Sequence, residues 1–485
     1  MPDFDLLVVG GGPGGYVAAI RAAQRGLRVG LVEKERPGGV CLNWGCIPTK
    51  AMLRSAEIFQ TVKDAADFGI HAESVRFDFA AVRQRKDGIV KELTDGVAGL
   101  LKANGVTVVE GHARFTGPTT VEVFEAGTSP IFPGGPRYAA APTAVATRTI
   151  SATDVIVATG SVPAVLPVPG ADLPGVVTSD GAFGLTEVPK RLVVIGGSAV
   201  GAEWASLFAT FGSEVTVVEM QDRLVPLEDK EIGVALGRSF GTHGITVLTG
   251  STVTGIARAD DGLRVSVGGP KARGLDADVV LVGVGRRPNT ADLGLDAAGI
   301  GADARGFIPV DDQLRTNVEH VYAIGDVTGK ALLAHVASHQ GLTAADVIAG
   351  HEAHIDYAVI PAATFTHPEI ASVGLTEDAA RAAGHQVITA KFPFAALGRA
   401  KSFGAPEGFM KIVAGQKHKE VLGVHIIGPS ASDLITEGAL AISLEATLEE
   451  LADTIHAHPT LGEIGMEAAL TGLGLPVHIA PPRKR

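Results

Sequence analysis

Cysteine is nearly absent from this chain. Only two of its 485 residues are cysteines, Cys41 and Cys46, and both lie in the run CLNWGCIPTK. A framework of structural disulfides is therefore excluded, and a single close pair of thiols beside glycines points to redox chemistry. The alternative is a coincidental pair of buried thiols.

The spacing of the two cysteines restricts their local structure. Five residues along a regular helix separate Cα atoms by roughly 8–9 Å, which exceeds the ~7 Å that a disulfide can bridge. The pair can close only in a distorted turn, which Gly45 allows. Because Pro48 is tolerated only in the first turn of a helix, a helix is predicted to begin between Cys46 and Pro48. Its N-terminus would stabilise a thiolate at Cys46.

The chain also lacks a net positive charge and long apolar runs, and it has few aromatic residues. Its formal net charge is −12, which argues against a nucleic-acid partner, and aromatic residues make up only 5%. Prolines such as Pro163, Pro167 and Pro169 interrupt the longest uncharged stretches, so no membrane span is expected. A strand pattern begins at Phe4 and leaves no room for a leader peptide, so we expect a cytoplasmic protein.

Two segments have no expected role. Residues 126–148 are rich in Gly, Pro, Ala and Thr, which predicts a surface loop or hairpin. The basic residues Arg483, Lys484 and Arg485 follow two prolines and are interpreted as a frayed terminus.

A glycine-rich turn follows the first apolar run. The run Leu6–Val9 leads into Gly10, Gly12 and Gly15, then a helical stretch, YVAAIRAAQRG, and a second strand that ends at Glu33. The glycines permit a tight turn and the close approach of a pyrophosphate, the helix N-terminus attracts its charge, and the acid accepts from a ribose hydroxyl. This first finger predicts a bound dinucleotide; a glycine turn that merely packs a helix on a sheet is the alternative.

The same unit occurs again downstream. LVVIGG leads through Gly196 and Gly201 into AEWASLFATFG and then SEVTVVE, which ends at Glu219. Both fingers place the acid 23 residues after the first glycine (33 − 10 and 219 − 196). Ser198 takes the middle glycine position, where its hydroxyl could donate to a phosphate. Glu219 favours NAD over NADP, and Arg223 is the nearest counter-argument. Two fingers imply two dinucleotides.

From Phe4 to about Leu470 the chain resembles the flavin disulfide oxidoreductases. The motifs that carry this resemblance are GGGPGGY at 10–16, CLNWGCIPTK at 41–50, ATGS at 158–161, GRRPN at 285–289, YAIGD at 322–326, THPEIASVGLTE at 366–377 and HAHPTLGE at 456–463. The resemblance implies FAD on the first finger and NAD on the second.

The resemblance also assigns roles to residues around the two cofactors. Lys50 is expected near the flavin N5, paired with Glu203, and Asp326 is expected to bind the ribitol side of the flavin. The other expected contacts are Gly10, Gly12, Gly15, Glu33, Ala113, Gly160 and Ala334 for FAD, and Gly196, Ser198, Gly201, Glu219 and Gly285 for NAD. No metal site is expected.

His458 is the third catalytic element that the resemblance implies. In such enzymes this histidine, oriented by a glutamate at the position of Glu463, serves the thiols as acid and base, a task that suits imidazole near neutral pH. The alternative is structural, because Thr460 and Glu463 also form the helix capping-box pattern T-x-x-E.

The resemblance implies an α/β fold with two Rossmann-like domains, for FAD and NAD, and a C-terminal α+β dimerisation domain. The expected divisions are 1–160 (FAD), 161–286 (NAD), 287–355 (completing the FAD site) and 356–485 (interface). In the last of these, KEVLGVHIIG is predicted as a strand and ASDLITEGALAISLEA as a helix. The family forms homodimers in which the histidine reaches the cysteines of the other subunit.

Within the family, the expected activity is oxidation of dihydrolipoamide or lipoylated carriers by NAD. Mercuric reductases add a C-terminal cysteine pair, whereas this chain has no cysteine after Cys46. Soluble transhydrogenases lack the first cysteine, whereas this chain has Cys41. A glutathione-type reductase would use NADPH and carry basic residues where Glu219 stands. A scaffold subunit without turnover is the alternative from another class.

Overall fold

The computed structural model describes residues 1–125 and 145–480. The predicted loop over 126–148 falls mostly outside these residues, and the basic tail falls wholly outside them. The described chain divides into two compact units. The first contains residues 1–165, 177–187 and 285–355, and the second contains 166–176, 188–284 and 356–485.

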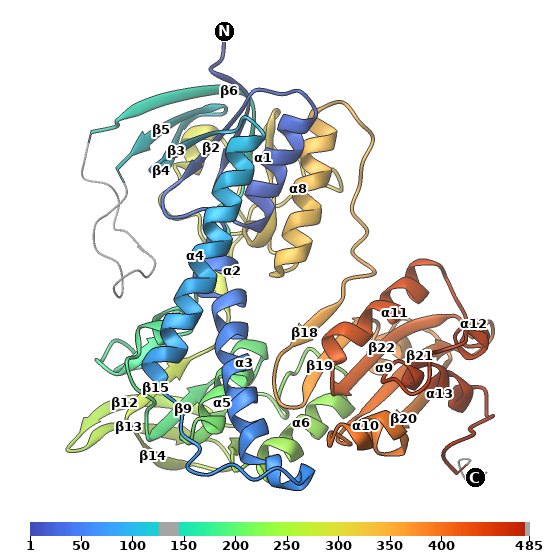
Figure 1. Cartoon of the computed structure of the whole chain (residues 1–485). Helices are drawn as coiled ribbons and strands as arrows, with labels where there is room; N and C mark the ends of the chain where they lie inside the picture. Colours follow the sequence, from blue (N-terminus) through green and yellow to red (C-terminus); the bar gives the residue numbers. More distant parts are fainter. Residues whose placement is uncertain (126–144, 481–485) are drawn as a thin grey trace. The chain divides into compact units, whose positions relative to one another are not determined.

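The first unit is built on a largely parallel sheet (Figure 1). Its order is β3 (Thr107–Glu110), β2 (Val29–Glu33), β1 (Phe4–Val9), β6 (Arg148–Val157), β5 (Thr120–Phe124) and β4 (His112–Gly117), and β17 (Val321–Ala323) also pairs with β6. Strands β1, β2, β3, β6 and β17 run parallel, whereas β4 and β5 extend the sheet as antiparallel strands. The carboxyl ends of β1, β2 and β6 therefore share one edge.

Both faces of β1 are buried, which explains its continuous apolar run. Leu6 and Val8 belong to the cluster that contains helix residues such as Ala18, and Leu7 and Val9 belong to the cluster on the opposite face. The helices of this unit are α1 (Pro13–Gln24), α2 (Gly39–Trp44), α3 (Cys46–Lys63), α4 (Phe79–Ala103), α7 (Leu295–Ala298) and α8 (Ala334–Ile348).

Helices α1 and α8 lie side by side (Figure 1) and approach each other closely at Gly14 and Gly341. A Cβ atom added to Gly341 would lie 2.5 Å from the Gly14 carbonyl oxygen, so a larger residue cannot replace this glycine without movement. Other short elements are η1 (Ala65–Phe68), β7 (Ser161–Pro163), β8 (Val176–Thr178), η2 (Gly181–Gly184), β16 (Arg286–Pro288) and η3 (Gly325–Thr328).

The second unit contains its own parallel sheet. Strands β11 (Thr246–Leu248), β10 (Glu214–Val218), β9 (Arg191–Ile195) and β15 (Val279–Val282) pair in parallel in that order. Helices α5 (Ala199–Thr210) and α6 (Lys230–Thr242) accompany it, and β12 (Thr252–Ala259), β13 (Gly262–Gly268) and β14 (Arg273–Ala277) form an antiparallel sheet. The strand–helix–strand order predicted around the second finger is confirmed.

The C-terminal part of this unit is an antiparallel sheet with helices. Its order is β18 (Ala362–Thr364), β19 (Glu369–Gly374), β22 (Val421–Gly428), β21 (Phe409–Gly415) and β20 (Val387–Pro393). The other elements are α9 (Glu377–Ala382), η4 (Phe394–Ala396), α10 (Gly398–Ser402), α11 (Ala431–Ser443), α12 (Leu448–Asp453) and α13 (Glu463–Gly472). The predicted strand and helix over 419–446 correspond to β22 and α11 and are confirmed, as is the α/β fold class.

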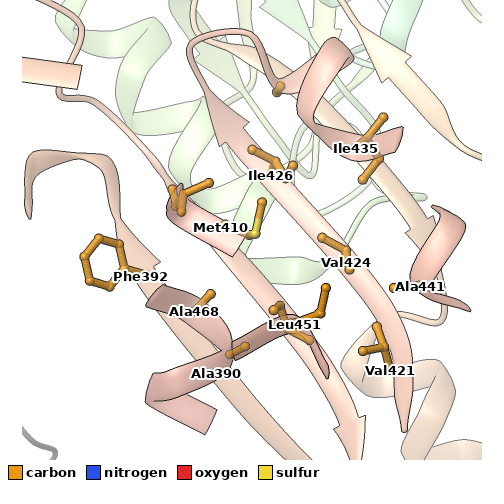
Figure 2. Close-up of a cluster of buried hydrophobic side chains, with 14 of the residues drawn as sticks. Ala390, Phe392, Met410, Val421, Val424, Ile426, Ile435, Ala441, Leu451 and Ala468 are labelled. Atoms are coloured by element: carbon orange, nitrogen blue, oxygen red, sulfur yellow. The ribbon is translucent and has the colours of Figure 1, made fainter. Parts of the chain in front are cut away.

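An apolar core joins this sheet to its helices (Figure 2). Phe392, Met410 and Ile426 come from the strands, Ile435 comes from α11, and Ala468 comes from α13. All five are at most 3% exposed, so the core holds α13 and its preceding loop against the sheet.

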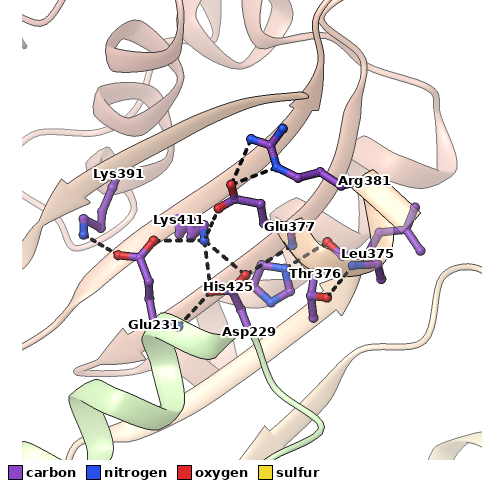
Figure 3. Close-up of polar contacts among 10 residues, drawn as sticks. Asp229, Glu231, Leu375, Thr376, Glu377, Arg381, Lys391, Lys411 and His425 are labelled. Atoms are coloured by element: carbon purple, nitrogen blue, oxygen red, sulfur yellow. Dashed lines mark hydrogen bonds and ion pairs between the residues drawn. The ribbon is translucent and has the colours of Figure 1, made fainter. Parts of the chain in front are cut away.

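A buried cluster of charges joins the finger region to the C-terminal sheet within the second unit (Figure 3). The Lys411 ammonium lies 3.0 Å from Asp229 Oδ1 and 2.9 Å from both Glu231 Oε1 and Glu377 Oε2. Only 3% of the Lys411 side chain is exposed. We call Lys411, Asp229, Glu231 and Glu377 the Lys411 cluster. It connects α6 with β21 and α9.

Candidate active site

The two cysteines lie where one helix ends and the next begins. Cys41 is in α2, and Cys46 is the first residue of the 18-residue helix α3. Gly45 separates them with φ −138° and ψ −109°, outside helical geometry. The predicted helix start between Cys46 and Pro48 is confirmed. A Cβ on Gly45 would lie 2.8 Å from the Val40 carbonyl oxygen, so the distorted turn depends on glycine.

Both cysteines are partly buried. A side-chain hydrogen bond with Cys46, followed by burial, raises the pKa of Cys41, and the positive charge of Lys50 opposes this shift. Deprotonation of Cys41 is therefore disfavoured while Cys46 stays beside it. The helix N-terminus favours negative charge at Cys46, so the structure distinguishes the two sulfurs electrostatically.

The first finger has the geometry that its glycines predict. Gly10 adopts φ +108°, and an added Cβ would lie 2.3 Å from the Ala158 carbonyl oxygen. A Cβ on Gly15 would lie only 1.8 Å from the Gly10 carbonyl oxygen. In contrast, a Cβ on Gly12 would approach nothing nearer than the Gly39 Cα at 3.9 Å. Gly10 and Gly15 must be glycine for the turn to form, whereas Gly12 leaves space above the helix N-terminus.

The second finger repeats this geometry. Gly196 adopts φ +101°, and Cβ atoms on Gly196 and Gly201 would lie 2.4 Å and 1.9 Å from backbone oxygens. Ser198 is the N-cap of α5 with φ −76° and ψ −178°, close to the φ −68° and ψ −176° of Gly12 at the N-cap of α1. The serine therefore fits the turn without strain. Its side chain is exposed and makes no capping hydrogen bond, so the hydroxyl is available to a ligand.

The two acids hold their fingers in the same way. The Gly11 N–H donates to Glu33 Oε2 at 2.6 Å, and the Gly197 N–H donates to Glu219 Oε2 at 2.6 Å. The other carboxylate oxygens accept from the backbone N–H groups of Glu35 and Gln221. Both acids thus fix the turn, a structural role that the pattern alone did not reveal. Burial raises the pKa of Glu33 despite these hydrogen bonds.

Arg223 does not point freely toward a ligand. Its Nη1 donates to Asp222 Oδ1 at 2.9 Å, and its Nη2 donates to the Pro226 carbonyl oxygen at 3.2 Å. With these contacts in place, Arg223 is a weaker candidate for binding the 2′-phosphate of NADP, and the preference for NAD expected from Glu219 stands.

Asp326 lies in the turn η3 beside two of the sequence motifs. The Ser161 hydroxyl donates to Asp326 Oδ2, and Arg286 Nε donates to the same hydroxyl at 2.7 Å. Burial raises the pKa of Asp326, although the Ser161 hydrogen bond and the Arg286 charge oppose the shift. Gly325, which precedes it, donates its N–H to the fully buried Gln340 amide oxygen at 2.6 Å.

The remaining residues expected around FAD lie in the first unit as well. Ala113 is buried in β4, Ala334 opens α8, and Gly160 adopts φ +69° with open space at its Cβ position. Gly285, expected in the NAD site, belongs to this unit too, whereas the second finger belongs to the other unit. Gly285 also has φ +106° and open space at its Cβ position.

The residues present suit FAD. The space over Gly12 is the cradle that a pyrophosphate needs, and the Thr159 hydroxyl beside Gly10 is buried without a hydrogen-bond partner. The indole N–H of Trp44, the last residue of α2, is also buried without a hydrogen-bond partner. Unsatisfied buried polar groups are rare in proteins, and a bound polar ligand would satisfy them.

His458 and Glu463 form a pair in the second unit. His458 Nδ1 lies 2.8 Å from Glu463 Oε1, and 79% of the histidine side chain is exposed. Burial raises the pKa of Glu463, but the hydrogen bond with His458 leads the opposing effects, and the net shift is downward. The carboxylate therefore orients the ring and leaves Nε2 open to a proton-exchanging partner.

The capping box at this helix forms only in part. Glu463 Oε2 accepts from the Thr460 N–H at 2.8 Å, but the Thr460 hydroxyl donates to the Ala457 carbonyl oxygen instead of capping the helix. Helix α13 begins at Glu463 with Gly462 as its N-cap, so the capping-box interpretation of Thr460 is wrong. Glu463 serves the histidine and the loop at once.

Lys50 lies in the first unit and Glu203 in the second. Lys50 is in α3, one turn after Cys46, where its charge acts on Cys41. Glu203 is in α5, only 5% exposed, and its Oε1 accepts from the Phe365 N–H at 2.9 Å. Their expected pairing stays a prediction, as do the four domain boundaries.

Sequence reasoning missed three residues around Asp326. Ser161 and Arg286 stand inside the ATGS and GRRPN motifs, but no role was expected for them. Asp180, which is 1% exposed and 3.3 Å from Arg286 Nη1, lies in a segment without any motif. The only signal for the first two was a polar or charged side chain in a motif otherwise made of turn residues.

Within residues 1–125 and 145–480, His, Cys, Asp and Glu side chains form no group of three that could hold a metal ion. None of the helices in these same residues is long and apolar enough to span a membrane.

Two nucleotide fingers, a dithiol at a helix N-terminus and a histidine–glutamate pair define a dinucleotide-dependent thiol oxidoreductase. The family model for pyridine nucleotide-disulphide oxidoreductases matches residues 4–341, and the model for their dimerisation domain matches residues 360–469. The chain belongs to this family. It is an FAD-containing, NAD-dependent oxidoreductase with two Rossmann-like domains and a C-terminal dimerisation domain.

Curated relatives match along the whole chain. A dihydrolipoyl dehydrogenase from Chlamydia muridarum is 44% identical, with 99% of each chain covered. One from Geobacillus stearothermophilus is 45% identical, with 98% of each covered. Among solved structures, LpdA from Mycobacterium tuberculosis has a TM-score of 0.85 at 28% identity, covering 96% of this chain and 98% of that one. The HOCl-induced flavoprotein disulfide reductase RclA from Escherichia coli has a TM-score of 0.84 at 27% identity, covering 96% and 99%.

Proposed function

We propose that this enzyme oxidises dihydrolipoyl groups and reduces NAD. The net reaction converts a dihydrolipoyl group and NAD⁺ into a lipoyl group, NADH and a proton. The observation that carries the proposal is the dithiol of Cys41 and Cys46 at the start of α3. Relatives that match over nearly their whole length and are named dihydrolipoyl dehydrogenase support the choice of substrate.

The oxidised enzyme would carry a Cys41–Cys46 disulfide. His458 takes the proton from one substrate thiol, and the resulting thiolate attacks the sulfur of Cys41. The bond between Cys41 and Cys46 breaks, and Cys46 leaves as a thiolate. The second substrate thiol, also deprotonated, then attacks the substrate sulfur of the mixed disulfide, which releases the lipoyl disulfide and leaves Cys41 reduced.

The differences between the two sulfurs fit these roles. A good leaving group is a stabilised thiolate, and Cys46 sits at the N-terminus of an 18-residue helix. Cys41 in the dithiol form retains a proton, because its hydrogen bond with Cys46 and its burial raise its pKa. Cys41 is therefore assigned to the substrate side and Cys46 to the flavin side.

FAD would be held by the first finger through Gly10, Gly12, Gly15 and Glu33, with Asp326 on its ribitol side. When bound, FAD supplies the two-electron chemistry that connects the dithiol with NAD. Lys50, whose positive charge acts on Cys41, would lie near the flavin, and pairing with Glu203 would orient it. The backbone at Ala113, Gly160 and Ala334 would complete the pocket.

The second finger would hold NAD. Gly196 and Gly201 form the turn, and the exposed Ser198 hydroxyl would donate to a phosphate. Glu219 disfavours a 2′-phosphate by charge, and Arg223 is engaged by Asp222 and cannot compensate without giving up that contact. Gly285 would line the same pocket.

The working form would be a homodimer in which His458 acts on the dithiol of the other subunit. The match to a dimerisation domain over residues 360–469 supports a dimer. Lipoylated carrier domains would supply the substrate, and the proposed compartment is the cytoplasm, where thiols are kept reduced.

The decisive assay supplies the purified holoenzyme with dihydrolipoamide and NAD⁺ and measures NADH. Parallel reactions contain NADP⁺ in place of NAD⁺, or oxidised glutathione with NADPH. We expect turnover with dihydrolipoamide and NAD⁺ and far less in the other two reactions. Activity only with glutathione and NADPH would overturn the proposal.

A pair of histidine variants tests the acid–base assignment. His458→Gln should lower turnover by about 10²–10⁴-fold, because the thiols lose their proton acceptor. His385→Gln, an exposed turn residue in the same unit, is the matched control and should behave like the native enzyme. Equal activities of both variants would contradict the role of His458.

A further inference from the structure

A chain of four polar side chains runs from a motif-free turn to the acid expected beside the flavin. Asp180 Oδ1 lies 3.3 Å from Arg286 Nη1, and Arg286 Nε donates to the Ser161 hydroxyl at 2.7 Å. That hydroxyl donates in turn to Asp326 Oδ2. All four residues lie in the first unit, although up to 165 residues separate hydrogen-bonded neighbours in the sequence.

Arg286 is held rigidly at the centre of this chain. A third contact, from Nη2 to the Ser161 carbonyl oxygen at 2.9 Å, makes the guanidinium straddle the backbone and the side chain of one residue. Only 17% of the Arg286 side chain and 1% of the Asp180 side chain are exposed. A buried carboxylate next to a buried guanidinium compensates its charge and fixes its direction.

Two opposing effects act on the Asp326 carboxyl group. Burial raises its pKa, and the Ser161 hydrogen bond and the Arg286 charge lower it. Of the elements packed against η3, β16 presents the charge of Arg286 and α8 presents the uncharged amide of Gln340. Strand β7 adds only the hydroxyl of Ser161, and Asp180 acts from behind Arg286.

We propose that Arg286, anchored by Asp180, is a positioning residue that keeps Asp326 ionised and directs it through Ser161. The inference rests on the proposed role of Asp326 in holding the ribitol side of FAD. An ionised carboxylate accepts hydrogen bonds from ligand hydroxyl groups with both oxygens, whereas the neutral acid loses part of that capacity. Protonation of Asp326 therefore couples FAD affinity to pH, and Arg286 sets the pH at which affinity begins to fall.

The test is a titration of full-length apoprotein with FAD, followed by the quenching of flavin fluorescence, over the range from about pH 4 to pH 8. In the native protein, affinity should fall as the pH drops through the midpoint at which Asp326 becomes protonated. Arg286→Met should move this midpoint upward by about one to two pH units, since a nearby opposite charge changes a carboxyl pKa by that amount. Arg286→Lys keeps the charge and should move it less.

The chain offers a matched control on the same strand. Arg287 follows Arg286 in β16, is exposed, and loses the same charge when changed to Met. Arg287→Met should leave the midpoint where it is. Ser161→Ala removes only the relaying hydroxyl and should raise the midpoint as well, so the test stands even if Arg286→Met does not fold.

Asp326→Asn separates this inference from the proposed function. It should weaken FAD binding at neutral pH and abolish the pH midpoint. If it binds FAD as the native protein does, the role of Asp326 is wrong. If Asp326→Asn weakens FAD binding but Arg286→Met and Ser161→Ala leave the midpoint unchanged, only the role of Arg286 is overturned. The same conclusion follows if Arg287→Met moves the midpoint as far as Arg286→Met does.

Discussion

Replacing Lys411 with Met leaves a buried carboxylate without its counter-charge. Asp229 is 2% exposed as a side chain, so it cannot regain water in the folded protein. Glu231 and Glu377 are 42% and 27% exposed and can turn toward solvent. Breaking a buried ion pair costs about 3–5 kcal/mol. Since Asp229 is the one carboxylate that stays trapped, we expect the lower part of this range, about 3 kcal/mol.

Lys391→Met is the matched control for this substitution. Lys391 pairs with the same Glu231, but 49% of its side chain is exposed. Exposed ion pairs contribute at most about 1 kcal/mol. The free energies of unfolding would be measured by urea denaturation at equal protein and FAD concentrations, because ligand and dimer formation shift the apparent stability.

The stability difference between the native protein and Lys411→Met should depend on pH, in a direction set by the pKa shift of Asp229 in each protein. Burial raises the pKa of Asp229, but Lys411 and backbone N–H groups outweigh it, so the folded pKa lies below the unfolded value. This stabilisation is present above the unfolded pKa of ~3.9 and is lost as the pH falls through the folded pKa. In Lys411→Met, burial is opposed only by the two backbone N–H groups, so the pKa of Asp229 should rise above the unfolded value. The variant then takes up a proton on folding, and the stability gap should narrow as the pH falls from about 7 to about 4.

A double variant tests whether the trapped charge of Asp229 causes the loss of stability. Asp229→Asn added to Lys411→Met removes the trapped charge, while asparagine keeps the N-cap role that Asp229 has at α6. It should recover most of the lost stability. If Lys411→Met costs no more than Lys391→Met at neutral pH, or if the double variant is less stable than the single one, the reasoning from buried charge is wrong.

Three further expectations concern the site. Cys46→Ser should abolish turnover of dihydrolipoamide while the protein keeps FAD, which visible absorbance would show; normal turnover would contradict the dithiol role. Glu463→Gln should lower turnover by about tenfold or more, measured against unchanged FAD content, because an amide orients the histidine with less charge. Gly15→Ala should prevent FAD retention, since its Cβ would meet a carbonyl oxygen at 1.8 Å. Gly88→Ala, where the added Cβ meets nothing within 4 Å, should retain FAD.

The local elements around the fingers and the cysteines could be predicted because each depends on a short stretch of chain. Glycines that need positive φ, apolar strands and a proline in the first helical turn act over a few residues. This is why the start of α3 at Cys46 and the helix after each finger could be predicted from sequence. The capping-box prediction failed because α13 begins at Glu463 with Gly462 as its N-cap, which leaves Thr460 outside the first turn of the helix.

The contacts that hold the site in place could not be predicted. Asp180 and Arg286 are 106 residues apart, and the Lys411–Asp229 pair spans 182 residues. No periodicity or motif reports which buried charges will meet, because that depends on how separate elements pack. The sequence-based interpretation could name Asp326 but not the side chains that set its charge.

The two acids at the ends of β2 and β10 show why a pattern can be correct and yet incomplete. Each carboxylate already accepts two backbone N–H groups, which satisfies the turn before any ligand arrives. A carboxylate oxygen has two lone-pair sites, so each acid still has capacity for ribose hydroxyl groups. Replacing Glu219 to admit a 2′-phosphate would therefore loosen the finger itself. Coenzyme preference and the shape of the turn depend on the same side chain, and a change of preference must first supply another acceptor for the Gly197 N–H.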